Sequence, residues 1–126
     1  MNAVVGLTSF ALVITVATAS GQPDLFTISL PGGATLQTYI DPGRAGPNVV
    51  HFTFFQASGA EQPISSASAS AVAPSSQTET VPLIRFDSGH FVANTSLASG
   101  RWTFLIQATA RSGQVLSGYF TQEIRT

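Results

Sequence analysis

The chain lacks cysteine and lysine, and charged side chains make up only 9% of its 126 residues. Without cysteine it has no disulfide, no thiolate metal site and no thiol nucleophile. With five arginines and a formal net charge of −1, it has no basic surface suited to a nucleic-acid backbone. Stability must therefore come from an apolar core. Nine phenylalanines and Trp102 are available for it, and burying a large apolar side chain is worth roughly 1.5–3 kcal/mol.

The sequence after residue 20 has no helical run. Short segments rich in Val, Ile, Thr and Phe are instead separated by Gly and Pro clusters, as in strands joined by turns. This spacing predicts an all-β domain, an immunoglobulin-like antiparallel β-sandwich of seven to eight strands. The expected strands are Leu25–Leu30, Ala34–Ile40, Asn48–Gln56, Ile64–Ala73, Val81–Phe86, His90–Asn94, Arg101–Thr109 and Val115–Ile124.

Period-two alternation assigns one face of three of these strands to the core. The predicted core residues are Leu36, Thr38, Ile40, Val50, Phe52, Phe54, Trp102, Phe104, Ile106 and Ala108. Val49 and Phe55 lie on the second face of their strand, so a neighbouring domain or lipid is expected to cover that face in part. Ile64–Ala73 alternates Ser and Ala, thin side chains that fit an edge strand or a close sheet contact, and the polar loop that follows favours a sheet edge.

The segment Asn2–Ser20 carries no charge and is almost continuously apolar. Nineteen residues in a helix span roughly 28 Å, against a hydrocarbon core of about 30 Å. We therefore expect a transmembrane helix within residues 1–21, followed by an extracytoplasmic β-sandwich domain over residues 22–126. A cleaved signal segment is the alternative, because Ala17-Thr18-Ala19 has the small-x-small form, but no Lys or Arg precedes the apolar run. Met1 as an internal start within a longer membrane protein is a third interpretation.

The two histidines are the candidate metal ligands. His51 lies on the strand face opposite Val50 and Phe52, and His90 follows the turn Asp87-Ser88-Gly89. One hypothesis is that they meet across the two sheets, with Asp87 as carboxylate partner, and hold a weakly bound Cu(II). The favoured interpretation is simpler, namely a strand histidine and a turn histidine without a metal. Two imidazoles fall short of a complete copper ligand set, so no metal site is assigned.

Other motifs have structural explanations. Asp87-Ser88-Gly89-His90 contains the residue types of a hydrolase triad, but adjacent turn positions rarely provide its geometry, so we predict no enzymatic activity. Gly43-Arg44-Ala45-Gly46 is expected to be a turn and not a phosphate cradle. Arg101 is expected at the surface, with Trp102 packed inward. Asn94-Thr95-Ser96 fits a glycosylation sequon, a weak signal that depends on a eukaryotic secretory route.

Three segments carry a resemblance to a known family. They are Asp41-Pro42-Gly43-Arg44-Ala45-Gly46-Pro47-Asn48, Pro82-Leu83 followed by Gly89-His90-Phe91, and Gly100-Arg101-Trp102. With the preceding Asn2–Ala19 segment, they resemble the extracytoplasmic C-terminal β domain, and the last membrane helix before it, of CopD/YcnJ-type bacterial copper resistance and import proteins. That domain is related to the YtkA-like β domains.

The resemblance implies a membrane-tethered accessory domain of a copper transport or resistance system, located at the cell membrane with the β domain outside the cytoplasm. It would act by interaction and not by catalysis, with the membrane and a membrane protein as partners and no nucleic acid. Copper is the implied ion, although the family's metal-handling His- and Met-rich elements lie elsewhere and this chain has only His51, His90 and Met1. The alternative function is a generic surface β-sandwich module for adhesion or assembly.

Overall fold

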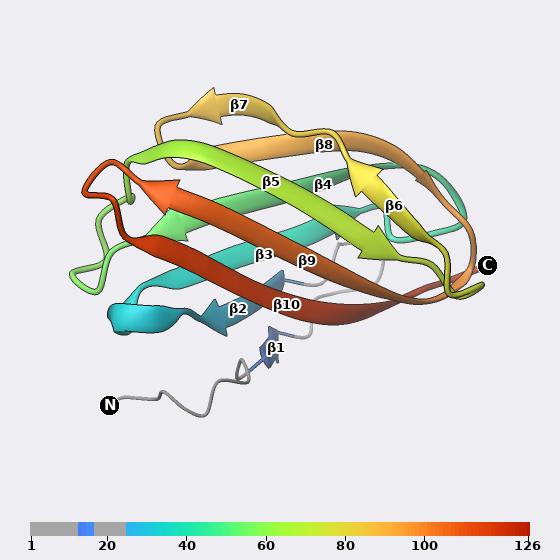
Figure 1. Cartoon of the computed structure of the whole chain (residues 1–126). Helices are drawn as coiled ribbons and strands as arrows, with labels where there is room; N and C mark the ends of the chain where they lie inside the picture. The colour runs from blue at the N-terminus through green and yellow to red at the C-terminus, as the bar shows by residue number, and fades with distance from the viewer. Residues whose placement is uncertain (1–12, 17–24) are drawn as a thin grey trace.

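The computed structural model describes residues 13–16 and 25–126, which form two antiparallel sheets packed face to face (Figure 1). The predicted all-β sandwich is therefore confirmed, although the described residues form ten strands and not seven to eight. Its elements are β1 (Val13–Val16), β2 (Leu25–Ser29), the 3-10 turn η1 (Pro31–Gly33), β3 (Thr35–Asp41), β4 (Gly46–Phe55), β5 (Ile64–Val72), β6 (Thr78–Val81), β7 (Ile84–Asp87), β8 (His90–Leu97), β9 (Gly100–Ala110) and β10 (Val115–Ile124).

The six-stranded sheet has the order β1-β2-β3-β4-β8-β7, and the four-stranded sheet has the order β10-β9-β5-β6. The chain changes sheet between β4 and β5, between β6 and β7, and between β8 and β9. Every pairing between these strands is antiparallel, and the pleat of each strand presents alternate residues to the interior and to the outer face of its sheet.

The core lies between the sheets and contains all ten residues that alternation assigned to it. Phe120 joins the two layers. Its ring lies 5.7 Å from Phe26 and 6.4 Å from Phe52 of the six-stranded sheet, and it stacks at 5.1 Å on Phe104 of its own sheet. Such aromatic pairs add about 0.5–1.5 kcal/mol each beyond the area they bury.

The predicted strand Val81–Phe86 is wrong as a single element. It divides at Pro82 into β6, which pairs with β5 in one sheet, and β7, which pairs with β8 in the other. Proline has no N–H to donate to a ladder, so pairing stops there and the chain crosses between the layers (Figure 1).

The predicted edge position of Ile64–Ala73 is also wrong. β5 pairs with β9 along its length and with β6 over Ala69–Val72, so it is an inner strand of the four-stranded sheet. Its small side chains allow this position: Ala69 and Ala71 are buried between the sheets, and the serines alternate with them along the strand.

The predicted membrane helix falls largely outside the described residues. The described part, Val13–Val16, is not helical but forms β1, which pairs antiparallel with Leu25–Ile28 of β2. A run of Val, Ile, Thr and Val is β-branched throughout, and such residues favour a strand where a sheet edge is open to pairing. Within residues 13–16 and 25–126 there is no helix long and apolar enough to cross a bilayer.

Asn48 organises the loop between β3 and β4. Its side chain is buried, its Oδ1 accepts the Gly43 N–H at 2.7 Å, and its Nδ2 donates to the carbonyls of Arg44 at 2.8 Å and Gly46 at 2.9 Å. The expected turn at Gly43–Gly46 is thus confirmed, and positive φ angles at both glycines, 77° and 113°, explain their presence. One buried amide holds the loop closed.

We predict that Phe120→Ala lowers the free energy of unfolding by about 3–5 kcal/mol, because it leaves a cavity where the two sheets meet. Thr121→Ala, an exposed position next to it in β10, is the control and should change stability by no more than about 0.5 kcal/mol. Urea unfolding followed by Trp102 fluorescence measures both. Equal effects of the two substitutions would contradict the central place of Phe120.

We also predict that Asn48→Asp destabilises the domain more than Asn48→Ala does. The alanine variant loses three hydrogen bonds, a cost of about 1–3 kcal/mol, whereas the aspartate variant in addition turns a buried carboxylate oxygen toward two carbonyl oxygens. Unfolding midpoints in urea give the order of the two variants. The opposite order would mean that the amide donors do not hold this loop.

Candidate functional site

A row of four rings crosses the outer face of the six-stranded sheet. Tyr39 of β3 stacks on His51 of β4 with ring centroids 4.1 Å apart and planes 10° from parallel. His51 meets His90 of β8 at 5.6 Å, and Phe86 of β7 packs its edge against His90 at 5.0 Å. We call Tyr39, His51, His90 and Phe86 the ring row.

The register explains why these side chains meet. Tyr39 lies opposite His51 in the β3–β4 pair, so their side chains are direct cross-strand neighbours. His51 lies opposite Val92 in the β4–β8 pair, and His90 is two residues before Val92 on the same face. The two histidines are therefore diagonal neighbours, which long or aromatic side chains can bridge.

The two imidazoles contact each other directly. His51 Nδ1 and His90 Nε2 are 3.4 Å apart, a distance at which one ring nitrogen donates its hydrogen to the other. Both side chains are half-buried. The hypothesis that they meet is thus confirmed in part, with the correction that they lie in one sheet and not across two.

The pKa of His51 is lowered from its ordinary value of 6.5. Burial is the main cause, because it disfavours the charged imidazolium, and a positive charge on His90 acts in the same direction. Asp41 has the opposite effect. His51 is therefore held as a neutral imidazole at neutral pH, the form in which histidine binds metals.

The proposed carboxylate partner does not join the pair. Asp87 is exposed, and its Oδ1 accepts the Ser88 N–H at 2.8 Å. The Ser88 hydroxyl donates to Glu61 Oε2 at 3.1 Å, and the same oxygen accepts the Gly89 N–H at 2.8 Å. Ser88, His90 and Asp87 therefore do not form a hydrolase triad, because each side chain bonds to a different group.

The remaining motifs lie away from the ring row. Trp102 is buried and its Nε1 donates to the Ala98 carbonyl at 2.8 Å, whereas Arg101 is exposed, as the sequence predicted. Asn94, the sequon residue, is exposed on β8. Val49 and Phe55, for which a cover was expected, are half-buried on the same outer face as His51.

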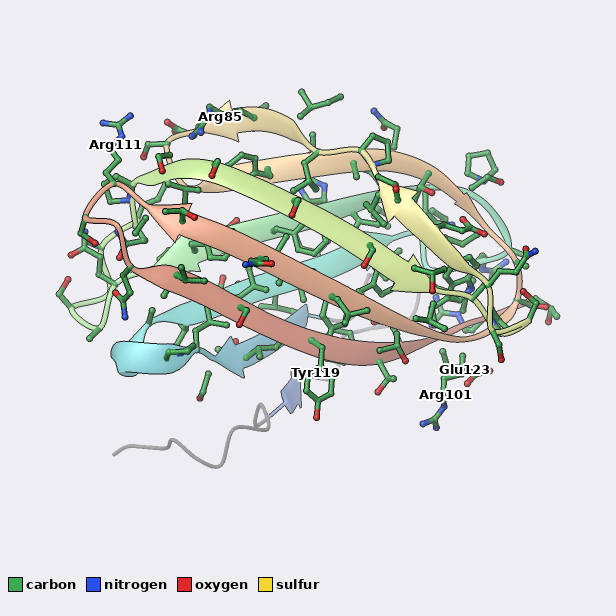
Figure 2. The ribbon with its side chains drawn as sticks, in the orientation of Figure 1. Arg85, Arg101, Arg111, Tyr119 and Glu123 are labelled. Carbon is green, nitrogen blue, oxygen red and sulfur yellow. The ribbon has the colours of Figure 1, made fainter. Side chains whose placement is uncertain are left out.

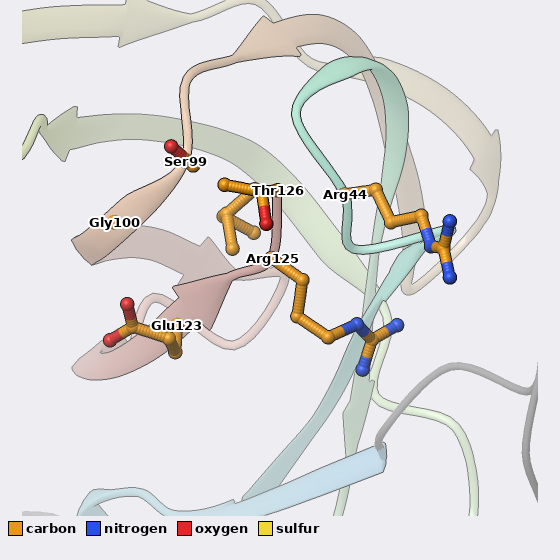
Figure 3. Close-up of a pocket in the computed structure, with 7 residues that line it drawn as sticks. Arg44, Ser99, Gly100, Glu123, Arg125 and Thr126 are labelled. Atoms are coloured by element: carbon orange, nitrogen blue, oxygen red, sulfur yellow. The ribbon is translucent and has the colours of Figure 1, made fainter.

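A shallow hollow lies at the end of the sandwich where the chain finishes (Figure 3). Arg44 and Arg125 extend to the same side of it, and Glu123 points the other way (Figure 3). Arg125 donates from Nη2 to the Pro42 carbonyl at 3.1 Å, and its backbone pairs with the loop at Gly43 and Ala45. These contacts join the residue after β10 to the β3–β4 loop, and neither histidine lines the hollow.

Sequence reasoning missed Tyr39 and Phe86. Tyr39 alternates with the core residues Thr38 and Ile40, so its place on the outer face was predictable from the pattern. Its contact with His51 was not, because that depends on the register of β3 against β4. Phe86 was missed because its segment was expected to continue from Val81.

Comparison with known proteins yields a fold and no family. No protein-family model matches the chain, and no curated protein matches it. A solved DUF4785 family protein from Legionella pneumophila is similar to this chain with a TM-score of 0.58 and 14% sequence identity. The similarity covers 74% of this chain and 28% of that one. At this identity the likeness concerns the fold alone.

The lowered His51 pKa predicts a pH-dependent stability. A histidine that is harder to protonate in the folded state stabilises the fold fully above its unfolded pKa of 6.5. That contribution is lost as the pH falls below 6.5 and through the folded pKa. Urea midpoints between pH 8 and about pH 5 should therefore fall less for His51→Gln than for the unsubstituted chain. Identical pH profiles for the two proteins would contradict this.

Proposed function

We propose that this chain is a membrane-tethered, extracytoplasmic accessory domain of a copper transport or resistance system, built on an immunoglobulin-like sandwich. It acts by interaction and not by catalysis, and it holds Cu(II) transiently between His51 and His90. The observation that carries the proposal is the 3.4 Å separation of His51 Nδ1 and His90 Nε2.

That separation fits shared coordination of one ion. Imidazole nitrogens bind first-row metals at about 2.0–2.1 Å. Two nitrogens at about 2 Å from one ion are roughly 2.8 Å apart when they are neighbouring ligands and about 4 Å apart when they are opposite. The observed distance lies between these limits. Imidazole is also a ligand type that suits copper, and the lowered pKa of His51 favours the neutral ligand form.

The rest of the site supports transient and not permanent binding. Among residues 13–16 and 25–126 there is no group of three or more His, Cys, Asp or Glu side chains placed to hold an ion. Two imidazoles leave the other coordination positions to water or to ligands from a partner. The pair is half-buried on an outer sheet face, so an ion can enter and leave without opening the core.

The segments that resemble the copper family support the fold part of the proposal. Asn48 closes the β3–β4 loop, Gly89 lies against the backbone of Gln62 with no space for a side chain, and Trp102 anchors the β8–β9 connection. Each of these residues has a structural role that does not involve copper. The proposed copper role therefore depends on the pair of His51 and His90 and not on these segments.

A membrane tether that includes Val13–Val16 is incompatible with the pairing of β1 and β2. Val13–Val16 cannot belong to a membrane helix and pair with β2 at the same time, so the tethered state requires β1 to leave the sheet. Leu25, the first residue of β2, lies opposite Tyr39 near the β3–β4 loop, so the tether would enter at that end of the sandwich. Fractionation of cells expressing the full chain, with a carbonate wash, tests the tether separately from metal binding.

Titration with Cu(II) tests the proposed site. We expect stoichiometric Cu(II) to broaden the ring resonances of His51 and His90 selectively, and to give an electron paramagnetic resonance spectrum with two nitrogen ligands. His51→Ala and His90→Ala should each weaken binding at least about tenfold, equivalent to 1.4 kcal/mol. Asn94→Ala, on the same face, is the control and should leave the affinity unchanged. Unchanged histidine resonances at stoichiometric Cu(II) would falsify the copper role and favour a surface module for adhesion or assembly.

A further inference from the structure

The longest edge strand of the described structure is β10. It has ten residues, whereas β1, β6 and β7, the other strands at sheet edges, have four each. An edge strand presents a row of unpaired backbone groups, and proteins usually protect such edges with proline, lysine, bulges or short length. β10 contains no proline or lysine, pairs with β9 over ten consecutive residues without a bulge, and carries one charge, on Glu123.

The register shows which backbone groups of β10 face outward. Ala110 N–H donates to the Gln114 carbonyl at 2.8 Å, so that pair is hydrogen-bonded. Hydrogen-bonded and non-hydrogen-bonded pairs alternate along an antiparallel ladder. The odd-numbered residues from Val115 to Glu123 therefore direct their N–H and C=O groups away from β9. No backbone hydrogen bond from residues 13–16 or 25–126 reaches these groups.

The side chains along this edge are arranged symmetrically about Ser117. Val115 and Tyr119, two residues to either side, are both exposed, at 51% and 45%. Arg111 lies in the β9–β10 turn, where its N–H donates to the Pro63 carbonyl, and Glu123 lies opposite Arg101 of its own chain. Figure 2 shows Tyr119 pointing outward from this edge and Arg101 beside Glu123.

We propose that β10 pairs antiparallel with β10 of a second copy of this chain, about a two-fold axis at Ser117. The two four-stranded sheets then form one continuous sheet of eight strands. In this register Val115 of each copy lies opposite Tyr119 of the other, an apolar cross-strand pair that occurs twice.

A second copy fits this edge better than an unrelated strand does. A two-fold interface uses the same patch on both partners, so the patch must complement itself. The symmetric positions of the exposed apolar side chains Val115 and Tyr119 meet that requirement. The adjoining outer face also suits an extended sheet, because its side chains from Thr103 to Thr109 on β9 are uncharged.

Sedimentation equilibrium of the full 126-residue chain over a range of concentrations tests the pairing. We expect a reversible change from monomer to dimer, and Ser117→Lys should abolish the dimer by placing two like charges directly opposite each other. Ser68→Lys, an exposed position of β5 in the same sheet, is the control and should still dimerise. Urea midpoints near the unsubstituted value show that both variants fold.

Charge substitution at the Val115–Tyr119 pair tests the antiparallel register. Val115→Arg and Tyr119→Glu should each weaken the dimer several-fold, because each places a charge against an apolar side chain, and the double variant should restore it, because opposite charges then face each other in both pairs. Ser117→Cys adds the chain's only cysteine and should give a disulfide-linked dimer under mild oxidation, whereas Ser68→Cys should not.

Several results would overturn the proposal. A monomer at all concentrations up to about 1 mM would mean that β10 does not pair with itself, as would pairing of this edge with the chain's own N-terminal segment. A dimer that survives Ser117→Lys would place the interface elsewhere. A dimer that the double charge substitution at Val115 and Tyr119 does not restore would contradict the proposed register.

Discussion

Packing of the two sheets around Phe120 is the contact on which the rest of the domain depends. With no cysteine in the chain, this ring and its neighbours Phe26, Phe52 and Phe104 hold the layers together through burial and aromatic contact. Because the space between the sheets is filled with apolar side chains, chemistry in this domain belongs to its outer faces, its edges and its ends. The ring row and the β10 edge both lie on such surfaces.

The two sheets present different outer surfaces. The six-stranded sheet carries half-buried imidazoles between aromatic rings, which suits an ion or a small ligand. The four-stranded sheet is rich in hydroxyl groups and carries few charges, which suits contact with another sheet better than contact with a charged ligand. A two-fold axis through Ser117 and perpendicular to the paired sheet would leave both six-stranded sheets on the same side. Both histidine pairs of a dimer would then be open to a common partner.

The alternation of apolar and polar residues predicted which side chains are buried, but it did not predict which strands pair with each other. A strand buries every second residue wherever it lies, so Val50, Phe52 and Phe54 could be assigned to the interior before their neighbours were known. The contact between His51 and His90 depends on β4 lying beside β8, which is a long-range choice that neither strand encodes locally. The same limit explains the error at β5, whose Ser-Ala pattern resembles that of an edge strand.

The N-terminal segment shows a related limit, since the apolar and β-branched run Val13–Val16 is compatible with a membrane helix and with a strand.

Among the described residues two connections of only two residues join the sheets, Pro82-Leu83 between β6 and β7 and Ala98-Ser99 between β8 and β9. From Val81 to Ile84 the chain has three steps of about 3.8 Å, and it must cross between sheets that pack about 10 Å apart. The connection between β6 and β7 is therefore close to fully extended, and it limits how far apart the two sheets can lie on that side. The opposite side, formed by β10 and β2, has no such short connection among the described residues. Along β10 the layers are instead held by side-chain packing, because the Phe120 ring lies 5.7 Å from Phe26 and Gly118 leaves no space for a side chain beside Leu30.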